Sequence, residues 1–151
     1  MNATKLYLIQ YRRQVERIRQ IENRIAQLTA AIESSPVNDG MPRGTNISRK
    51  VEALAVRLAE EKTKAEAAAV DAWAVRLEIE RVIDAVPDPA LARLLYDRYI
   101  TGRDWSDIAQ ALAYDESYTR GRLHLKALDA AGAIIGTDRD GKDATQCNIV
   151  M

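Results

Sequence analysis

Hydrophobic side chains recur at steps of three and four residues over two long stretches of the chain. The first stretch runs from about Thr4 to Glu33, and the second runs from about Ser48 to Val86 and stops before Pro87. This spacing predicts two long amphipathic helices. Between them, from about residue 34 to residue 47, proline, glycine, asparagine and aspartate are concentrated, which predicts a loop.

The two helices are expected to form a long, coiled-coil-like antiparallel hairpin over residues 1–86. A two-helix hairpin buries little apolar surface by itself and gains from a further layer. We therefore assign this region to oligomerisation or partner contact, with a homodimer through the N-terminal helices as one expected assembly. The sequence leaves open whether the hairpin is intramolecular.

A second module is expected over residues 87–135. Asp88 can cap a new helix with Pro89 at its first position. Three short helices follow, each with a terminator or a capping aspartate beside it: Ala90 to Ile100 before Gly102, Trp105 to Leu112 after Asp104, and Glu116 to about Ala130 after Asp115. A short turn between the last two helices is the helix-turn-helix plan. Residues 136–151 are polar at first and show no periodicity, so we expect a disordered tail there.

The composition favours an all-α fold, because Phe is absent while Ala, Leu, Ile, Arg and Glu abound. Cys147 is the only cysteine, so neither an intrachain disulfide nor a cysteine-based metal cluster is expected. No apolar stretch is long enough for a membrane span, and the first ten residues do not resemble a signal peptide. We expect a cytoplasmic protein without membrane contact.

Enzymatic chemistry finds no support in the sequence. There is no glycine-rich phosphate loop and no nucleophile–base arrangement, and His124 is the only histidine. We therefore predict that the chain is not an enzyme, has no catalytic residues, and uses neither a metal nor a cofactor.

Charge is balanced over the whole chain, with 22 basic and 22 acidic side chains. Within the second module, however, Arg120, Arg122 and Lys126 lie in a stretch without an acidic residue between Glu116 and Asp129. The N-terminal face of the third short helix is thus the candidate DNA-binding site. Its residues are Glu116, Ser117, Tyr118, Arg120, Gly121, Arg122 and Lys126.

Each residue type on this face suits a part of DNA recognition. A helix N-terminus and Ser117 can bind phosphate, arginine can read guanine through two hydrogen bonds, and Lys126 is placed for a backbone contact. The competing interpretation is a solvated helix face, which is the default for three charges on a helix. Tyr118 is as well suited to packing on the scaffold as to contacting DNA.

The segment from Leu95 to His124 resembles region 4 of bacterial sigma factors. The order of a long N-terminal helix, a loop containing Met41-Pro42-Arg43-Gly44, a second long helix and this module resembles phage transcriptional regulators of the ArpU/RinA type. The resemblance implies a phage or prophage protein in a bacterial host cell, which binds double-stranded DNA at a promoter and works with host RNA polymerase. Three features depart from the region 4 pattern: Ala113 stands where glycine is common, Thr119 where valine or isoleucine is usual, and Asp115-Glu116 open the recognition helix.

Two other functions remain open from the sequence. The protein can be an interaction adaptor that contacts RNA polymerase without reading DNA, which the neutral net charge favours. It can also be a small DNA-packaging subunit of a terminase, because those proteins join a helix-turn-helix to helical oligomerisation segments, although their DNA module usually lies N-terminal.

Overall fold

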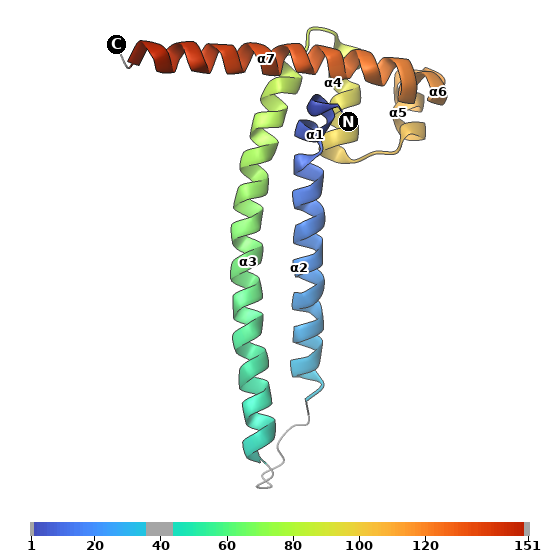
Figure 1. Ribbon diagram of the computed structural model, residues 1–151. Helices are drawn as coiled ribbons and strands as arrows, with labels where there is room; N and C mark the ends of the chain where they lie inside the picture. The colour runs from blue at the N-terminus through green and yellow to red at the C-terminus, as the bar shows by residue number, and fades with distance from the viewer. Residues whose placement is uncertain (1, 36–43, 150–151) are drawn as a thin grey trace. The chain divides into compact units, whose positions relative to one another are not determined.

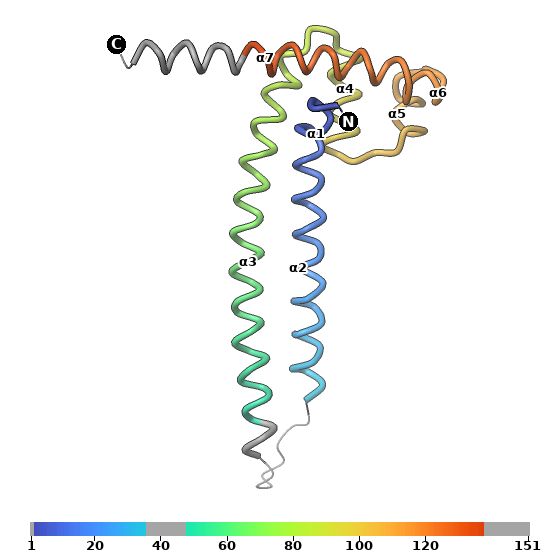
Figure 2. The backbone as a smooth tube through the Cα atoms, viewed as in Figure 1, coloured from blue at the N-terminus to red at the C-terminus, as the bar shows by residue number. Residues whose placement is uncertain are grey.

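The computed structural model describes the backbone of residues 2–35 and 44–149, and the side chains of residues 2–35 and 48–137 (Figures 1 and 2). Within these ranges the chain forms helices and no strand. The prediction of an all-α fold is confirmed. The helical elements in chain order are α1 (Ala3–Leu8), α2 (Gln10–Glu33), α3 (Gly44–Asp84), α4 (Pro89–Leu95), the π-helical turn η1 (Tyr96–Thr101), α5 (Trp105–Leu112), α6 (Glu116–Tyr118), a second π-helical turn η2 (Thr119–Leu123) and α7 (His124–Ile149).

Two of the three predicted capping aspartates form their side-chain hydrogen bonds. The Asp88 carboxylate accepts from the Ala90 amide at 2.9 Å, and the Asp115 carboxylate accepts from the Tyr118 amide at 3.4 Å. Asp104 also occupies the position before a helix, but its side chain makes no capping hydrogen bond. The helix starts were thus predicted correctly, whereas the capping arrangement at Asp104 was not.

Three element boundaries differ from the prediction. The first long helix is interrupted at Ile9, which separates α1 from α2, and α3 already begins at Gly44, inside the expected loop. The third helix of the module does not end near Ala130, because α7 continues to Ile149. This backbone differs from the disordered tail expected over residues 136–151. Helix propagation costs far less than nucleation, so a helix that is packed at one end can extend through a segment with weak propensity.

The chain divides into two compact units. One comprises Met1–Arg12 and Ala74–Met151, called here the helix-turn-helix unit, and the other comprises Arg13–Trp73, called the hairpin unit. The sequence placed all of residues 1–86 in the hairpin. The structure instead assigns α1 and the last turns of α3 to the helix-turn-helix unit.

The reason for this assignment is a shared hydrophobic core in the helix-turn-helix unit. Leu8 of α1 is fully buried, and Gly132 of α7 approaches α1 so closely that a Cβ atom there would lie 2.8 Å from the Thr4 hydroxyl oxygen. Residues of α1, α3, α4, η1, α5, η2 and α7 all contribute to the buried core: Leu8, Ile79, Val82, Ile83, Val86, Leu94, Leu95, Tyr99, Ile100, Ile108, Leu123, Ala127, Leu128 and Ala131. The three short helices are therefore not a free-standing domain.

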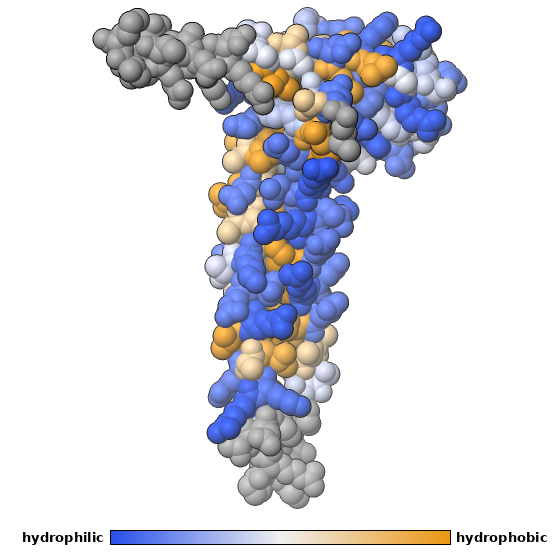
Figure 3. Space-filling view, in the orientation of Figure 1, coloured by the Kyte–Doolittle hydropathy of each residue, from blue (hydrophilic) through white to orange (hydrophobic). Residues whose placement is uncertain are grey.

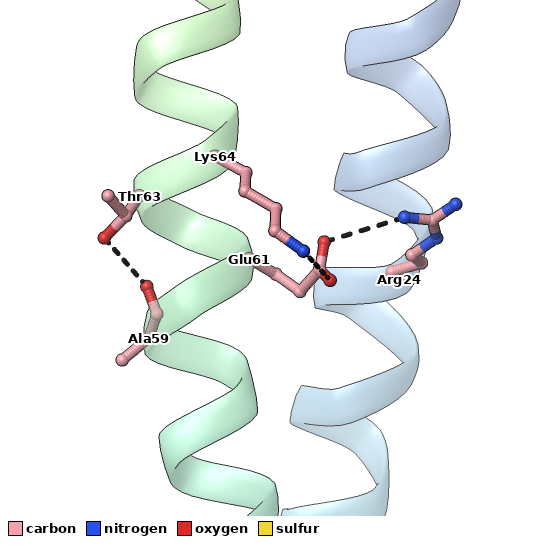
Figure 4. A network of polar contacts seen from close by, with 5 residues as sticks. All are labelled: Arg24, Ala59, Glu61, Thr63 and Lys64. Atoms are coloured by element: carbon pink, nitrogen blue, oxygen red, sulfur yellow. Dashed lines mark hydrogen bonds and ion pairs between the residues drawn. The ribbon is translucent and has the colours of Figure 1, made fainter.

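The hairpin unit, in contrast, is held by few buried side chains. In it α2 and α3 lie side by side (Figure 1), and among the residues described there Ile21, Ala72 and Glu61 are buried. The visible face of these two helices is mainly hydrophilic (Figure 3). Figure 4 shows the Glu61 carboxylate between Arg24 at 3.9 Å and Lys64 at 3.4 Å. The Glu61 side chain is buried, but those of Arg24 and Lys64 are 54% and 61% exposed, and ion pairs with such solvated partners add little net stability.

A Leu8→Ala variant tests whether the N-terminal helix is part of the helix-turn-helix unit. Because Leu8 is completely buried in the shared core, we expect the variant to lower the free energy of unfolding by about 2–5 kcal/mol. The measurement is denaturant unfolding followed by circular dichroism. The matched control is Leu125→Ala on α7, whose side chain is 58% exposed and whose truncation should change little. Equal stabilities of the two variants would contradict the shared core.

Candidate nucleic-acid interface

The turn between α5 and α6 is built on a left-handed backbone conformation. Ala113 has φ 61° and ψ 37°, its amide donates to the Gln110 carbonyl at 3.2 Å, and the Tyr114 amide donates to the Ala109 carbonyl at 3.0 Å. This is the hydrogen-bond pattern of a Schellman motif, in which glycine is favoured. Alanine can hold the same turn at a conformational cost of about 1–2 kcal/mol. The departure at Ala113 therefore strains the turn and leaves its geometry intact.

The second departure from the region 4 pattern, Thr119, also fits the scaffold. Thr119 is fully buried, and its hydroxyl donates to the Asp115 carbonyl at 2.8 Å. A buried hydroxyl with a hydrogen-bond partner avoids most of the cost of desolvation. Ile108 and Ala109 of α5 are buried as well, as expected where α5 crosses the helix that begins at Glu116. Threonine thus replaces an apolar residue here without leaving an unsatisfied polar group.

A buried aromatic cluster joins α5 and α7. The Tyr99 hydroxyl and His124 Nε2 are 2.6 Å apart, and the Trp105 ring meets the His124 ring edge-on with 4.7 Å between centroids. Burial, assisted by the charges of Lys5 and Arg98, lowers the pKa of His124 to about 4. Burial raises the pKa of Tyr99 to about 12. Both groups are therefore neutral near pH 7, and His124 belongs to the scaffold.

The predicted site residues lie along α6, η2 and the start of α7 (Figure 2). Thr119 and Leu123 point into the core, and the three residues between them are exposed. A Cβ atom added to Gly121 would meet nothing within 4 Å, so its surface is open. The exposed site residues are Glu116, Ser117, Arg120, Gly121, Arg122 and Lys126. Short π-helical turns such as η2 occur often at functional sites.

Tyr118 differs from the other site residues. It is only partly exposed and packs against the hydrophobic core, and its ring lies 5.4 Å from the ring of Tyr114. The sequence left two roles open for Tyr118, packing on the scaffold and contacting DNA. Its partial burial favours the first. Both residues of the neighbouring acidic pair are exposed, and Asp115 in addition caps the helix.

A set of charged residues that the sequence analysis did not single out lies at the other end of α5. Asp97 is buried, and its carboxylate forms ion pairs with Arg93 and Arg103. Arg98 lies over the Trp105 ring, 4.7 Å from its centroid. Arg93, Arg98 and Arg103 follow one another at steps of five residues, and side chains at this spacing lie on different faces of an α-helix. The π-helical turn η1 and the left-handed Gly102 bring them together.

Comparison with known proteins gives no match: no protein-family model, curated protein or solved structure is significantly similar to the chain. Over the residues that the structure describes, no helix is long and apolar enough to cross a membrane. In the same part of the chain, no group of histidine, cysteine or acidic side chains is arranged to hold a metal ion. The exposed polar side chains of the candidate site are those of Glu116, Ser117, Arg120, Arg122 and Lys126.

Replacing Ala113 with glycine should stabilise the protein. Glycine adopts the left-handed conformation without the steric cost that alanine has, although it loses more backbone entropy on folding. We expect Ala113→Gly to raise the free energy of unfolding by about 1 kcal/mol. Thermal and denaturant unfolding measure the change, with Ala111→Gly inside α5 as a control that should destabilise. A loss of stability in Ala113→Gly would contradict the turn geometry.

The buried imidazole of His124 should make stability depend on pH. The unfolded chain binds a proton with a pKa near 6.5, whereas the folded chain does so only near 4. Between these values the unfolded state binds more protons, so the free energy of unfolding falls as the pH is lowered from 6.5 to 4. Urea unfolding at a series of pH values measures this slope. His124→Gln should remove the slope in the upper part of this range, where carboxylates do not titrate, and an unchanged slope would show that His124 is not its source.

Proposed function

We propose that the protein is a sequence-specific transcription regulator that binds double-stranded DNA through α6, η2 and the start of α7. The observation that carries this proposal is the exposed Arg120-Gly121-Arg122 turn at the N-terminal end of a helix whose opposite side is buried in a helix-turn-helix scaffold. A helix presented in this way fits the major groove, which is where base pairs can be distinguished.

The side chains divide into base-reading and backbone-binding groups. Arg120 and Arg122 are the candidates for bidentate hydrogen bonds to guanine, while Ser117 and Lys126 are the candidates for phosphate contacts. Gly121 carries no side chain and has open space beside it, which allows a base edge or the sugar-phosphate backbone to approach the helix. Asp115 contributes by capping the helix, so one of the two acidic residues at its start serves the scaffold.

The resemblance to sigma-factor region 4 and to ArpU/RinA-type regulators supports a promoter as the target. On this proposal the protein acts in the cytoplasm of a bacterial host as a phage or prophage regulator, together with host RNA polymerase. It requires no cofactor and performs no chemistry on the DNA.

The alternative is an adaptor that contacts RNA polymerase without reading DNA. The balanced charge of the chain favours it, as do the apolar side chains of Val56 and Val70, which are 59% and 70% exposed on α3 and are available to a protein partner or to a second copy of the chain. Co-purification with polymerase from nuclease-treated extract, together with an absence of DNA binding by the folded protein, would support the adaptor.

The double variant Arg120→Ala plus Arg122→Ala tests the DNA-binding site. A selected operator is first obtained by enriching bound fragments from a genomic pool and sequencing them. Because a bidentate arginine–guanine contact contributes about 1–3 kcal/mol, we expect the double variant to lose at least about tenfold in operator affinity, measured by fluorescence anisotropy. Helicity should remain unchanged, because alanine is a good helix former.

The matched control is Arg49→Ala plus Arg57→Ala on α3, which removes the same charge from exposed positions. It should bind the operator as the wild type does. Equal losses in both double variants would mean that net charge alone governs binding, and unchanged binding in Arg120→Ala plus Arg122→Ala would reject the site.

A further inference from the structure

Four arginine side chains gather around the turn that connects η1 to α5. Gly102 has φ 79°, and the Arg103 amide donates to the Asp97 carbonyl at 2.8 Å, which fixes the turn. The Arg12 guanidinium packs against Gly102 so closely that a Cβ atom there would lie 2.5 Å from its Cζ. Arg98 Nη1 donates to the Arg103 carbonyl at 3.1 Å. The turn is thus held by hydrogen bonds and by arginine side chains.

Asp97 lies at the centre of this cluster. Its Oδ2 atom is 3.7 Å from Arg93 Nε and 3.8 Å from Arg103 Nη1. That oxygen is buried and has no hydrogen-bond partner among the residues that the structure describes. The carboxylate therefore attracts the two guanidinium groups by charge without occupying their N–H donors at hydrogen-bond distance.

The two arginines beside Asp97 remain accessible. The Arg93 and Arg103 side chains are 55% and 47% exposed. The four arginines outnumber the three acidic residues of this segment, Asp97, Asp104 and Asp107, so a net positive charge remains. Gathering like charges raises the free energy of the unbound protein, and an anion placed among them would lower it. Arginine forks match the geometry of a phosphate group.

We propose that Arg103 and Arg93, aligned by the buried Asp97, form a second binding site for DNA backbone phosphate, apart from the recognition helix. This inference rests on the proposed function, because it takes DNA as the ligand. Both sites belong to one packed unit: Arg98 stacks on Trp105, and Trp105 meets His124 at the start of α7. A phosphate contact here would set the orientation of the recognition helix without reading sequence. Asp97 is a positioning residue in this arrangement.

The test compares Arg103→Ala and Asp97→Asn with the wild type on a short mixed-sequence DNA duplex over a series of salt concentrations. Loss of one phosphate contact should reduce the slope of log affinity against log salt by about 0.9 in Arg103→Ala. Asp97→Asn distinguishes positioning from simple electrostatics, because removing a negative charge near DNA should raise affinity unless Asp97 aligns the arginines. We expect Asp97→Asn to bind DNA severalfold more weakly than the wild type. When Arg103→Ala is already present, adding Asp97→Asn should cause little further loss.

Three further measurements keep the outcomes separate. Arg81→Ala removes an exposed arginine from α3 in the same unit and should leave the salt slope unchanged. Thermal unfolding shows whether Asp97→Asn remains folded. Arg103→Lys keeps the positive charge but lacks the planar guanidinium group, so it tests the site without changing Asp97 and should also lose affinity. If the wild type binds DNA while Arg103→Ala keeps its full salt slope, or if Asp97→Asn binds more tightly, the second site is rejected and the proposed function stands. If the folded wild type binds no DNA, both are rejected.

Discussion

Burial of one apolar core decides how the helix-turn-helix unit is assembled. Three short helices of this size cannot bury enough apolar surface to be stable without a further layer. The additional surface comes from the first turns of the chain and from the end of α3, through Leu8, Ile79 and Ile83. Because these side chains pack with Leu94 and Leu128, the core closes only when segments from both ends of the sequence are present. The helix that begins at Glu116 is therefore held in part by Leu8, which lies more than a hundred positions away in the sequence.

The same core explains why the polar groups of the unit can be arranged so closely. Tyr99 and His124 form their hydrogen bond beneath the start of α7, and Trp105 packs against the imidazole ring. Side chains that are locked by packing hold their neighbours in defined positions, which a binding surface requires. Arg98 depends on this cluster directly, since it stacks on Trp105 while it donates to the turn at Arg103. The scaffold and the charged surface are thus one continuous set of contacts.

Local sequence patterns predicted those features that local interactions determine. The start of α4 after Asp88, the extent of α5 and the start of α6 after Asp115 follow from capping and periodicity, which act over a few residues. The packing of α1 on α7 was not predictable in this way, because an apolar stripe shows which face is buried and not which helix covers it. The arginine cluster was missed for a related reason. It depends on the π-helical turn η1 and on the left-handed Gly102. In a regular α-helix the side chains of Arg93, Arg98 and Arg103 would point in different directions, and these two features bring them together.

The balanced charge of the chain is compatible with DNA binding once the range of electrostatic forces is considered. At physiological ionic strength, charges separated by more than about 8 Å are largely screened. A phosphate group therefore responds to the side chains immediately around it, and hardly to the sum of 22 basic and 22 acidic residues. An acidic side chain that pairs with a neighbouring base, such as Glu61 with Lys64, counts toward the total although its charge is offset locally. Exposed arginines lie at two short turns, Arg120 to Arg122 and Gly102 to Arg103, although the charge of the whole chain is balanced. On the proposed function, affinity for DNA would depend on how a few arginines are aligned, and the buried Asp97 carboxylate, paired with Arg93 and Arg103, is placed to align two of them.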